Sequence, residues 1–332
     1  MATLKDVAKL ACVDVSTVSR ALNNTSYVHP DTKKKIYAAA KELGYRPNVM
    51  AKALRQGRAH TIGVVVPRLQ FAIFSELLQG IQEAARKLNY ETLICVTDDD
   101  PKKEADCLNR LRNGFVDGII IAATGRNGHL LRDIKASGIA VLQLIRKQDP
   151  KISSVVADYE GCGYEAVKYL YGIGCREIGI IAGSQHLAPY KGRYSGYQKG
   201  IQKFGLSENT SECDYMVNSF EYGYECAAQL LDHNYDLDAI IACLDVQGLG
   251  ASRLLKERNI SQHEVKLVSL TGHSIGKMLQ TSMTSMELPA CGMGTRAAEL
   301  IIDEIEHHSE ENIGIQHVMF QAELVEREST TL

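Results

Sequence analysis

Residues 3–23 read TLKDVAKLACVDVSTVSRALN and predict two short helices joined by a tight turn. Thr3 can cap a first helix, because apolar residues recur after it at helical spacing. Asp14 can cap a second helix over 15–22, since a short side-chain acceptor suits the N-cap position. The inward-facing residues of this second helix would be Val18 and Ala21 or Leu22. The outward-facing residues, whose groups suit base edges and phosphates, would be Ser16, Thr17, Ser19 and Arg20.

A third helix is expected after this pair, so residues 1–47 predict a small all-α head. The helix begins at Asp31 or Thr32 and runs through three consecutive lysines to Leu43. Gly44 then provides a C-cap, and Pro47 follows where the helix cannot continue.

Charge is divided unevenly between this head and the rest of the chain. The 332 residues include 37 Lys and Arg against 40 Asp and Glu, for a formal net charge of −3. Residues 1–58 hold eleven of the basic and four of the acidic residues, so this segment carries +7 and the remainder −10. A basic head predicts a polyanionic partner, because Lys and Arg displace counterions from phosphates. A solvated lysine-rich face would account for the charge equally well.

Three linked strings decide between these interpretations. TLKDVA at 3–8, VDVSTVSRALN at 13–23 and GYRPN at 44–48 resemble the N-terminal domain of LacI/GalR-family transcriptional repressors. The resemblance implies that Val15, Ser16 and Arg20 read bases in the major groove of double-stranded DNA. It also implies phosphate-anchoring or structural roles for Thr3, Thr17, Asn23, Tyr45 and Asn48. Asp14 stands where the family usually has Ser, and its negative charge suits the helix N-terminus but lies near phosphates.

Residues 48–59 are expected to form a hinge helix and a linker. The stretch 48–54 is short and weakly amphipathic, so it should be marginal as an isolated helix. It resembles the family's hinge helix, which folds when two subunits meet on the operator and inserts a leucine, here Leu54, into the minor groove. Lys52 stands where the family often has Arg. A featureless tether is the alternative interpretation.

The body, residues 60–332, alternates apolar strands with helices of about three turns, which is typical of doubly wound parallel sheets. Strands are expected at 61–66, 91–96 and 117–121, with helices at 76–88 and 103–113. A second run of strands is expected at 154–157, 177–182, 239–243 and 265–270. This α/β layout of two lobes resembles the periplasmic-binding-protein-like effector core of the same family. Family topology implies crossovers near 157, 287 and 316. The first lobe would then comprise 60–156 and 288–315, and the second 157–287 and 316–332.

Candidate effector-binding residues follow from position, because ligands of open α/β sheets bind beyond the carboxyl ends of strands. By resemblance, Arg193 matches the family's effector-binding arginine, whose planar fork can grip vicinal hydroxyls or a carboxylate. Asp245 matches an Asp that precedes a small-residue helix. The other candidates, two of them apolar walls against which a sugar ring could stack, are Phe71, Phe74, Arg146, Phe220 and Thr271. Core packing for the phenylalanines and a surface salt bridge for Arg193 are the alternatives.

Two departures from the family's sequence pattern narrow the class of effector that is expected. Leu244 replaces an Asn, and Thr271 with Gly272 replaces an Asp, that many sugar-binding members use for hydroxyl groups. A simple hexose is therefore a poor fit. The string LTGH at 270–273 is more similar to repressors that respond to disaccharides such as sucrose or trehalose.

Other motif matches do not support an enzyme. The string GCGYEA at 161–166 fits a loose dinucleotide-binding pattern, but no acidic residue closes a convincing next strand. The string GHSIGK at 272–277 is one residue short of a phosphate-binding loop. The pair His307 and His308 lies in a charged helix end, and the nine cysteines are scattered without metal-ligand spacing. We therefore expect no cofactor, no metal site, reduced thiols and no catalytic residue.

The sequence thus predicts a transcriptional repressor that binds a palindromic operator as a homodimer and responds to a small molecule, with a sugar as the expected class. The sequence contains no apolar run of membrane-spanning length and no secretory signal, so we expect a cytoplasmic protein. A dimer is expected because no leucine heptads follow the last strand. The alternatives are a sugar-binding module without DNA function and a Rossmann-type enzyme.

Overall fold

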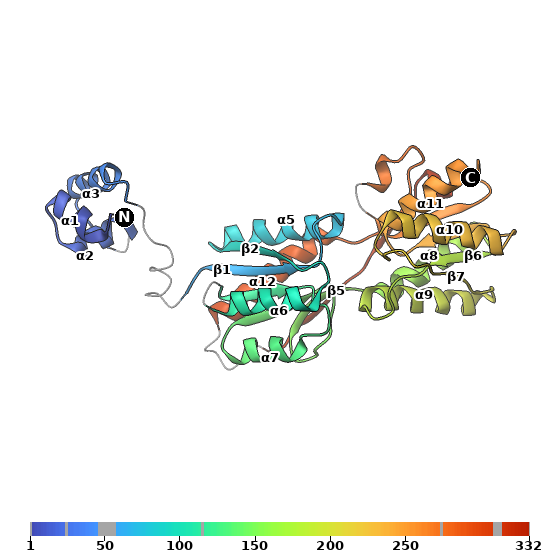
Figure 1. Ribbon diagram of the computed structural model, residues 1–332, viewed down its shortest axis with the longest axis horizontal. Helices are drawn as coiled ribbons and strands as arrows, with labels where there is room; N and C mark the ends of the chain where they lie inside the picture. Colours follow the sequence, from blue (N-terminus) through green and yellow to red (C-terminus); the bar gives the residue numbers. More distant parts are fainter. Residues whose placement is uncertain are drawn as a thin grey trace. The chain divides into compact units, whose positions relative to one another are not determined.

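The computed structural model describes residues 2–23, 26–45, 58–113, 116–272, 275–307 and 314–331. The chain divides between Ala59 and His60 into two compact units, whose elements are labelled in Figure 1. The expected hinge, with Asn48 and Leu54, lies outside the described residues except at its last two positions.

The first unit is a three-helix domain of α1 (Leu4–Ala11), α2 (Val15–Asn23) and α3 (Pro30–Glu42). Its core contains Val7, Val18 and Ile36, one from each helix, and all three are fully buried. Helix α3 begins before the expected Asp31 or Thr32, because Pro30 has a backbone angle that suits the first turn and no amide hydrogen to leave unpaired. Gly44 ends the helix in the left-handed conformation, at φ +59°.

The second unit contains two six-stranded sheets. The first has the order β11-β5-β4-β3-β1-β2, and all its pairings are parallel. Its strands are β1 (Thr61–Val66), β2 (Glu91–Val96), β3 (Gly118–Ile121), β4 (Ala140–Leu144), β5 (Ser153–Ala157) and β11 (His317–Phe320). Its helices are α5 (Ala72–Lys87), α6 (Pro101–Arg112), α7 (Gly128–Ala136) and α12 (Ala290–Glu306).

The second sheet has the order β12-β10-β9-β8-β6-β7, in which only β12 is antiparallel to its neighbour. Its strands are β6 (Ile178–Ile181), β7 (Asn209–Ser211), β8 (Ala239–Ala242), β9 (Lys266–Gly272), β10 (Thr284–Glu287) and β12 (Glu323–Val325). Its helices are α8 (Tyr159–Gly172), α9 (Ala188–Phe204), α10 (Phe220–His233) and α11 (Asp245–Glu257), and the short 3-10 helices are η1 (Gly276–Met278) and η2 (Glu328–Thr330).

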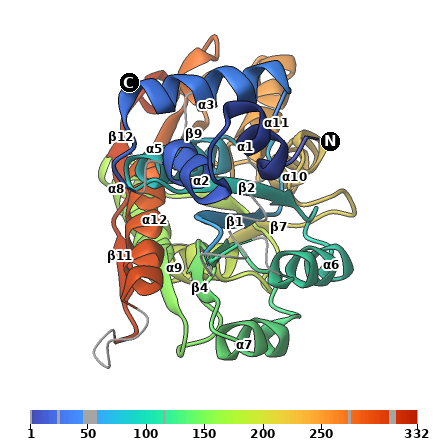
Figure 2. The same ribbon diagram turned by 90° about the vertical axis from the view of Figure 1, so that its left-hand side faces the viewer.

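Helices cover both faces of each sheet, which explains why the central strands are apolar throughout. In the first lobe α5 and α12 pack on one face, whereas α6 and α7 pack on the other (Figure 2). In the second lobe α8 and α9 oppose α10 and α11 in the same way. Among the described helices, none is both long and apolar enough to cross a membrane.

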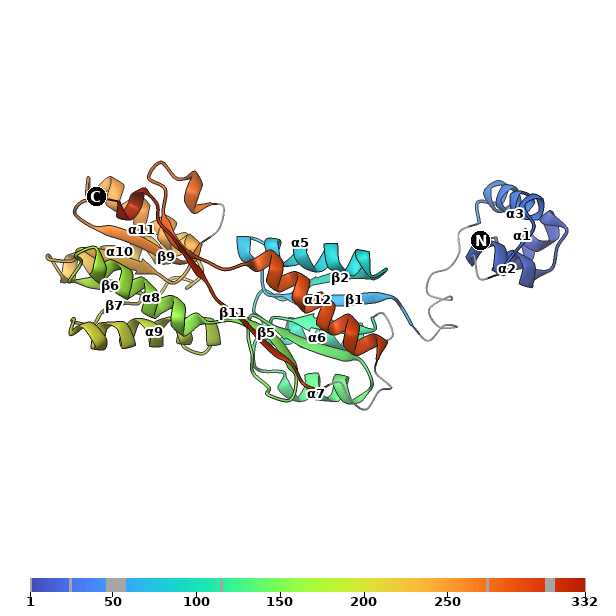
Figure 3. The same cartoon turned by 180° about the vertical axis from the view of Figure 1, so that it is seen from behind.

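One strand, β11, belongs to a different lobe from the one that the expected bounds assign. The strand β5, expected to open the second run, pairs with β4 in the first sheet, and β11 pairs with β5 (Figure 3). The third crossover therefore lies between Phe320 and Glu323 rather than near 316. Strand pairing decides this boundary, and the apolar pattern of a strand does not record which sheet it joins.

The string GCGYEA has a packing role within α8. A β-carbon at Gly163 would overlap the carbonyl oxygen of Arg193 in α9, and one at Gly196 in α9 would overlap the carbonyl oxygen of Glu160. These two glycines let the helix backbones meet directly. Close approach of α8 and α9 therefore explains Gly163 of the motif.

Candidate functional site

A cavity of about 290 Å³ lies between the two lobes. It lies beyond the carboxyl ends of the strands, where ligands of open α/β sheets bind. Six of the seven expected effector-binding residues line it, namely Phe71, Phe74, Arg146, Arg193, Asp245 and Thr271. The seventh, Phe220, lines a separate hollow beside α11 instead.

Arg193 is the unusual side chain of this cavity. It projects from α9, is only 2% exposed, and its Nε has no hydrogen-bond partner. Within the described ranges no carboxylate pairs with it. Its guanidinium carbon lies 5.1 Å from the centre of the Tyr159 ring, a cation–π contact. A buried guanidinium with an unused donor is costly, so the cavity favours a ligand that accepts hydrogen bonds there.

Tyr159 connects this arginine to the other lobe. Its ring belongs to α8, and its hydroxyl donates a 2.8 Å hydrogen bond to the carbonyl oxygen of Ile145, just after β4. Burial raises the pKa of Tyr159 well above its ordinary value, so the hydroxyl keeps the proton that it donates. The contact therefore joins the second lobe to the first beside the cavity.

Ile145 holds a strained backbone conformation at this contact. Its φ is +66°, a left-handed value that a β-branched residue rarely adopts. The amide of Arg146 donates to the carbonyl oxygen of Leu144 at 2.6 Å, which closes a tight γ-turn. The amide of Ile145 donates to Val155 at 2.9 Å, so hydrogen bonds on both sides maintain the strain.

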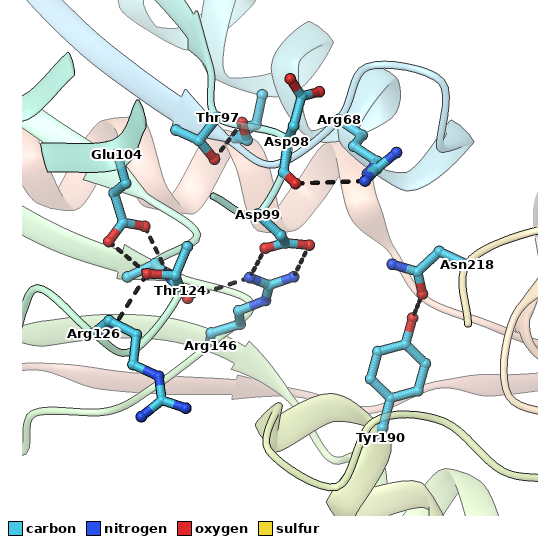
Figure 4. A network of polar contacts seen from close by, with 12 residues as sticks. Arg68, Thr97, Asp98, Asp99, Glu104, Thr124, Arg126, Arg146, Tyr190 and Asn218 are labelled. Carbon is cyan, nitrogen blue, oxygen red and sulfur yellow. Dashed lines mark hydrogen bonds and ion pairs between the residues drawn. The ribbon is translucent and has the colours of Figure 1, made fainter. Parts of the chain in front are cut away.

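Arg146 differs from Arg193 because it already has a carboxylate partner. Its two terminal nitrogens bind the carboxylate of Asp99 at 2.5 and 3.2 Å, and one also donates to the carbonyl oxygen of Ala123 at 3.3 Å (Figure 4). The side chain is 6% exposed. This paired geometry neutralises its charge, so Arg146 is less available to a ligand than Arg193.

Two polar groups from the second lobe complete the site. One oxygen of Asp245 accepts hydrogen bonds from Ser269 at 2.9 Å and Thr271 at 3.0 Å. The hydroxyl of Tyr190 donates to the side-chain oxygen of Asn218 (Figure 4). Burial raises the pKa of Tyr190 far above its ordinary range. Carboxylate and amide groups of this kind suit sugar hydroxyls.

Much of the remaining lining is apolar. Phe71 is partly buried, whereas Phe74 is almost fully buried and belongs to the core as well as to the cavity lining. Leu244, Val246 and Leu249 extend the apolar wall.

The candidates chosen from the sequence omitted three residues that also line the cavity, namely Tyr159, Tyr190 and Asn218. Tyr159 stands two residues after β5, so the rule used for the other candidates could have found it. Tyr190 and Asn218 lie farther from their strands and carry no comparable signal.

The expected DNA-binding residues that the structure describes in the first unit fall into three groups. Val15, at 41% exposure, Ser16 and Arg20 all face solvent from α2. Thr17 and Tyr45 are half-buried. The others bond locally, since Asn23 donates to the carbonyl oxygen of Ser19 at 2.8 Å and Thr3 donates to Asp6 at 2.7 Å in a capping box.

Both parts of the chain match families of known proteins. Residues 3–48 match bacterial regulatory proteins of the lacI family, and residues 59–323 match the periplasmic binding proteins and sugar binding domain of the LacI family. The transcriptional regulator RegA of Clostridium saccharobutylicum is 30% identical over 334 residues, which cover 99% of this chain and all of RegA.

Solved structures agree with this assignment. The complex of the transcriptional regulator CelR with cellobiose has a TM-score of 0.73 at 25% identity, and the match covers 99% of this chain and 100% of CelR. The Lac repressor dimer bound to operator and an anti-inducer shares the fold, with a TM-score of 0.85 at 21% identity over 100% of this chain and 99% of that one. The chain therefore belongs to the LacI family of bacterial regulatory proteins, with an N-terminal DNA-binding domain and a sugar-binding-type core.

Proposed function

We propose that this repressor binds a palindromic operator as a homodimer, and that a sugar in the interlobe cavity controls its affinity for DNA. The observation that carries the proposal is the buried, unpaired Arg193 at a cavity lined by both lobes. The CelR structure holds cellobiose, which makes disaccharides the first class to test. The cavity volume is small for a ligand site, so monosaccharides belong in the same panel.

The first unit supplies the proposed contact with DNA. Arg20 is the guanidinium on the exposed face of α2, where it can reach the edge of a guanine. Val15 and Ser16 lie on the same helix and face solvent. In the proposed complex residues 1–47 read the operator and 48–59 form the hinge. The +7 charge of residues 1–58 would add affinity that does not depend on sequence.

Exposed apolar surface on the second unit supports a homodimer. The strand β2 is an edge of the first sheet, yet Leu93 is 43% and Val96 39% exposed. Edge strands that remain in water are normally protected by charge or proline. Met278 and Phe220 expose further apolar surface on the second lobe. A second copy of the chain would cover surface of this kind.

The control mechanism requires a ligand that distinguishes two arrangements of the lobes. A ligand changes DNA affinity only by its differential affinity for those arrangements, typically about 1 to 3 kcal/mol. Arg193 from the second lobe and Phe71 from the first would both contact the bound sugar. The hydrogen bond from Tyr159 to Ile145 would then strengthen or break as the lobes move.

Calorimetric titration with a panel of monosaccharides and disaccharides tests the effector. We expect heat with at least one sugar, and its loss in Arg193→Gln. Arg253→Gln is the matched control, because Arg253 is an exposed arginine paired with Glu257 on α11. A panel that gives no heat with any sugar would overturn the sugar assignment.

A gel shift with a library of palindromic duplexes tests DNA binding. We expect a selected sequence whose affinity falls steeply with salt, whereas a sugar-binding module without DNA function would select none. Sedimentation velocity tests the dimer, which Leu93→Asp should dissociate and the exposed control Tyr235→Ser should not. A thermal-shift screen with NAD and NADP addresses the enzyme alternative, and stabilisation by either would support it.

A further inference from the structure

Two cysteine thiols contact each other in the second lobe. The thiol of Cys226 donates to the sulfur of Cys213 across 3.6 Å. Cys226 lies in the middle of α10 and is fully buried, whereas Cys213 lies in the connection between β7 and α10 and is partly exposed. Neither residue lines the effector cavity. We propose that Cys213 and Cys226 form a reversible disulfide under peroxide stress, and that this bond adjusts the effector cavity through Asn218.

The asymmetry of the pair sets the order of the reaction. Burial raises the pKa of the Cys226 thiol, and the contact with Cys213 adds to that rise, so Cys226 holds its proton and donates it toward Cys213. Cys213 is the partly exposed residue of the pair, so hydrogen peroxide would meet it before the fully buried Cys226. Cys213 is therefore the residue of the pair that is placed to react with peroxide first, and Cys226 is placed to resolve the product.

The chemistry balances with hydrogen peroxide as the oxidant. The Cys213 thiolate attacks one peroxide oxygen, the O–O bond breaks, and the products are a sulfenic acid and hydroxide. The Cys226 sulfur then attacks the Cys213 sulfur, breaks its S–O bond and releases a second hydroxide. The two thiol protons convert the hydroxides to water. The two sulfurs lose two electrons in total, and the peroxide gains them.

Formation of the disulfide would require the connection 212–219, rather than α10, to move. The sulfurs must approach from 3.6 Å to roughly 2.0 Å. Helix α10 is held against α11, because a β-carbon at Gly223 would overlap the backbone of Gln247. The connection 212–219 is held by fewer bonds, among them that from Gln247 to the carbonyl oxygen of Val217 at 2.9 Å.

Movement of this connection would reach the cavity through one side chain. Asn218 precedes the N-cap residue Ser219 of α10 and accepts the hydrogen bond from Tyr190, which lines the cavity in the first turn of α9. The consequence for effector binding rests on the proposed function, whereas formation of the cross-link does not. The two claims therefore fail separately.

Peptide mapping of the whole protein after treatment with hydrogen peroxide tests the cross-link. We expect a peptide pair joining Cys213 and Cys226, with a loss of about 2 Da for the two thiol hydrogens and recovery on reduction. The exposed thiols Cys12 and Cys291 report that the oxidant has acted. Oxidation of these two while Cys213 and Cys226 still react with an alkylating agent would overturn the proposal.

Hydrogen exchange tests whether the cross-link between Cys213 and Cys226 changes the effector cavity. In the oxidised protein we expect altered exchange both in 214–218 and in the first turn of α9, and no such change in Cys213→Ser treated identically. A change confined to 214–218 would refute the connection to the cavity. The wild-type peptide map requires no variant, so the cross-link remains testable even if a substitution unfolds the lobe.

Discussion

Replacing Tyr159 with Phe removes one hydroxyl and keeps the ring beneath Arg193. The lost hydrogen bond, 2.8 Å long, leaves the carbonyl oxygen of Ile145 without that donor. An unsatisfied buried acceptor costs about 1 to 3 kcal/mol. Some of this cost is offset, because the strained turn at Ile145 can relax. The relaxation is incomplete while Val155 still accepts from the Ile145 amide. We therefore expect a destabilisation of about 1 to 2 kcal/mol, measurable by urea unfolding.

A matched variant separates stability from coupling. Tyr197→Phe also removes a fully buried hydroxyl, which donates to Ile178 at 2.8 Å, but both partners lie in the second lobe. Operator affinity is measured by gel shift with and without the sugar that calorimetry identifies. We expect Tyr159→Phe to reduce the effect of the sugar on operator affinity and Tyr197→Phe to leave it unchanged. If the sugar changes operator affinity by the same factor in both variants and in the wild type, the interlobe hydrogen bond has no role in the effector response.

Three further variants test other parts of the structure. Arg20→Ala should weaken specific operator binding by about 1 to 3 kcal/mol in a gel shift, and unchanged affinity would reject its base-reading role. Asp99→Ala leaves the buried Arg146 without its carboxylate and should lower the free energy of unfolding in urea by about 3 kcal/mol. This is the low end for such pairs, because Asp99 is partly exposed. An unfolding free energy close to that of the wild type would contradict the pairing. Gly163→Ala should force α8 and α9 apart at a cost of about 1 to 3 kcal/mol, whereas the control Gly172→Ala, in open space on the same helix, should cost far less.

The sequence predicted the elements well because their signals are local. In the first unit the inward positions Val18 and Ala21 are buried as periodicity requires. The strand 61–66 matches β1, since an uninterrupted apolar run between a polar linker and Pro67 permits no other placement. Helix α5 begins four residues before the expected start at Glu76, because its first turn contains the apolar residues Ala72, Ile73 and Phe74 in place of a cap signal.

The features that sequence reasoning missed depend on contacts between distant residues. Asp99 and Arg146 are separated by 47 positions, and Asp99 reaches the arginine from a left-handed turn after β2. The glycines of α8 match a nucleotide-binding pattern, and only the packing of α9 against them explains their size. The thiol contact between Cys213 and Cys226 has no sequence signal, because neither spacing nor composition records a meeting between a connection and a helix.

The pairing of β11 with β5 determines the order in which this protein can assemble during synthesis. The first lobe cannot complete its sheet until residues 317–320 have been made, although its other five strands end at Ala157. The core of the three-helix unit is built from residues between Leu4 and Tyr45, so this unit can fold much earlier. A ribosome that stalls after α11 would therefore release a chain with a folded head and an incomplete core. Such a fragment would lack β11 and β12, and with them the complete core that effector binding requires.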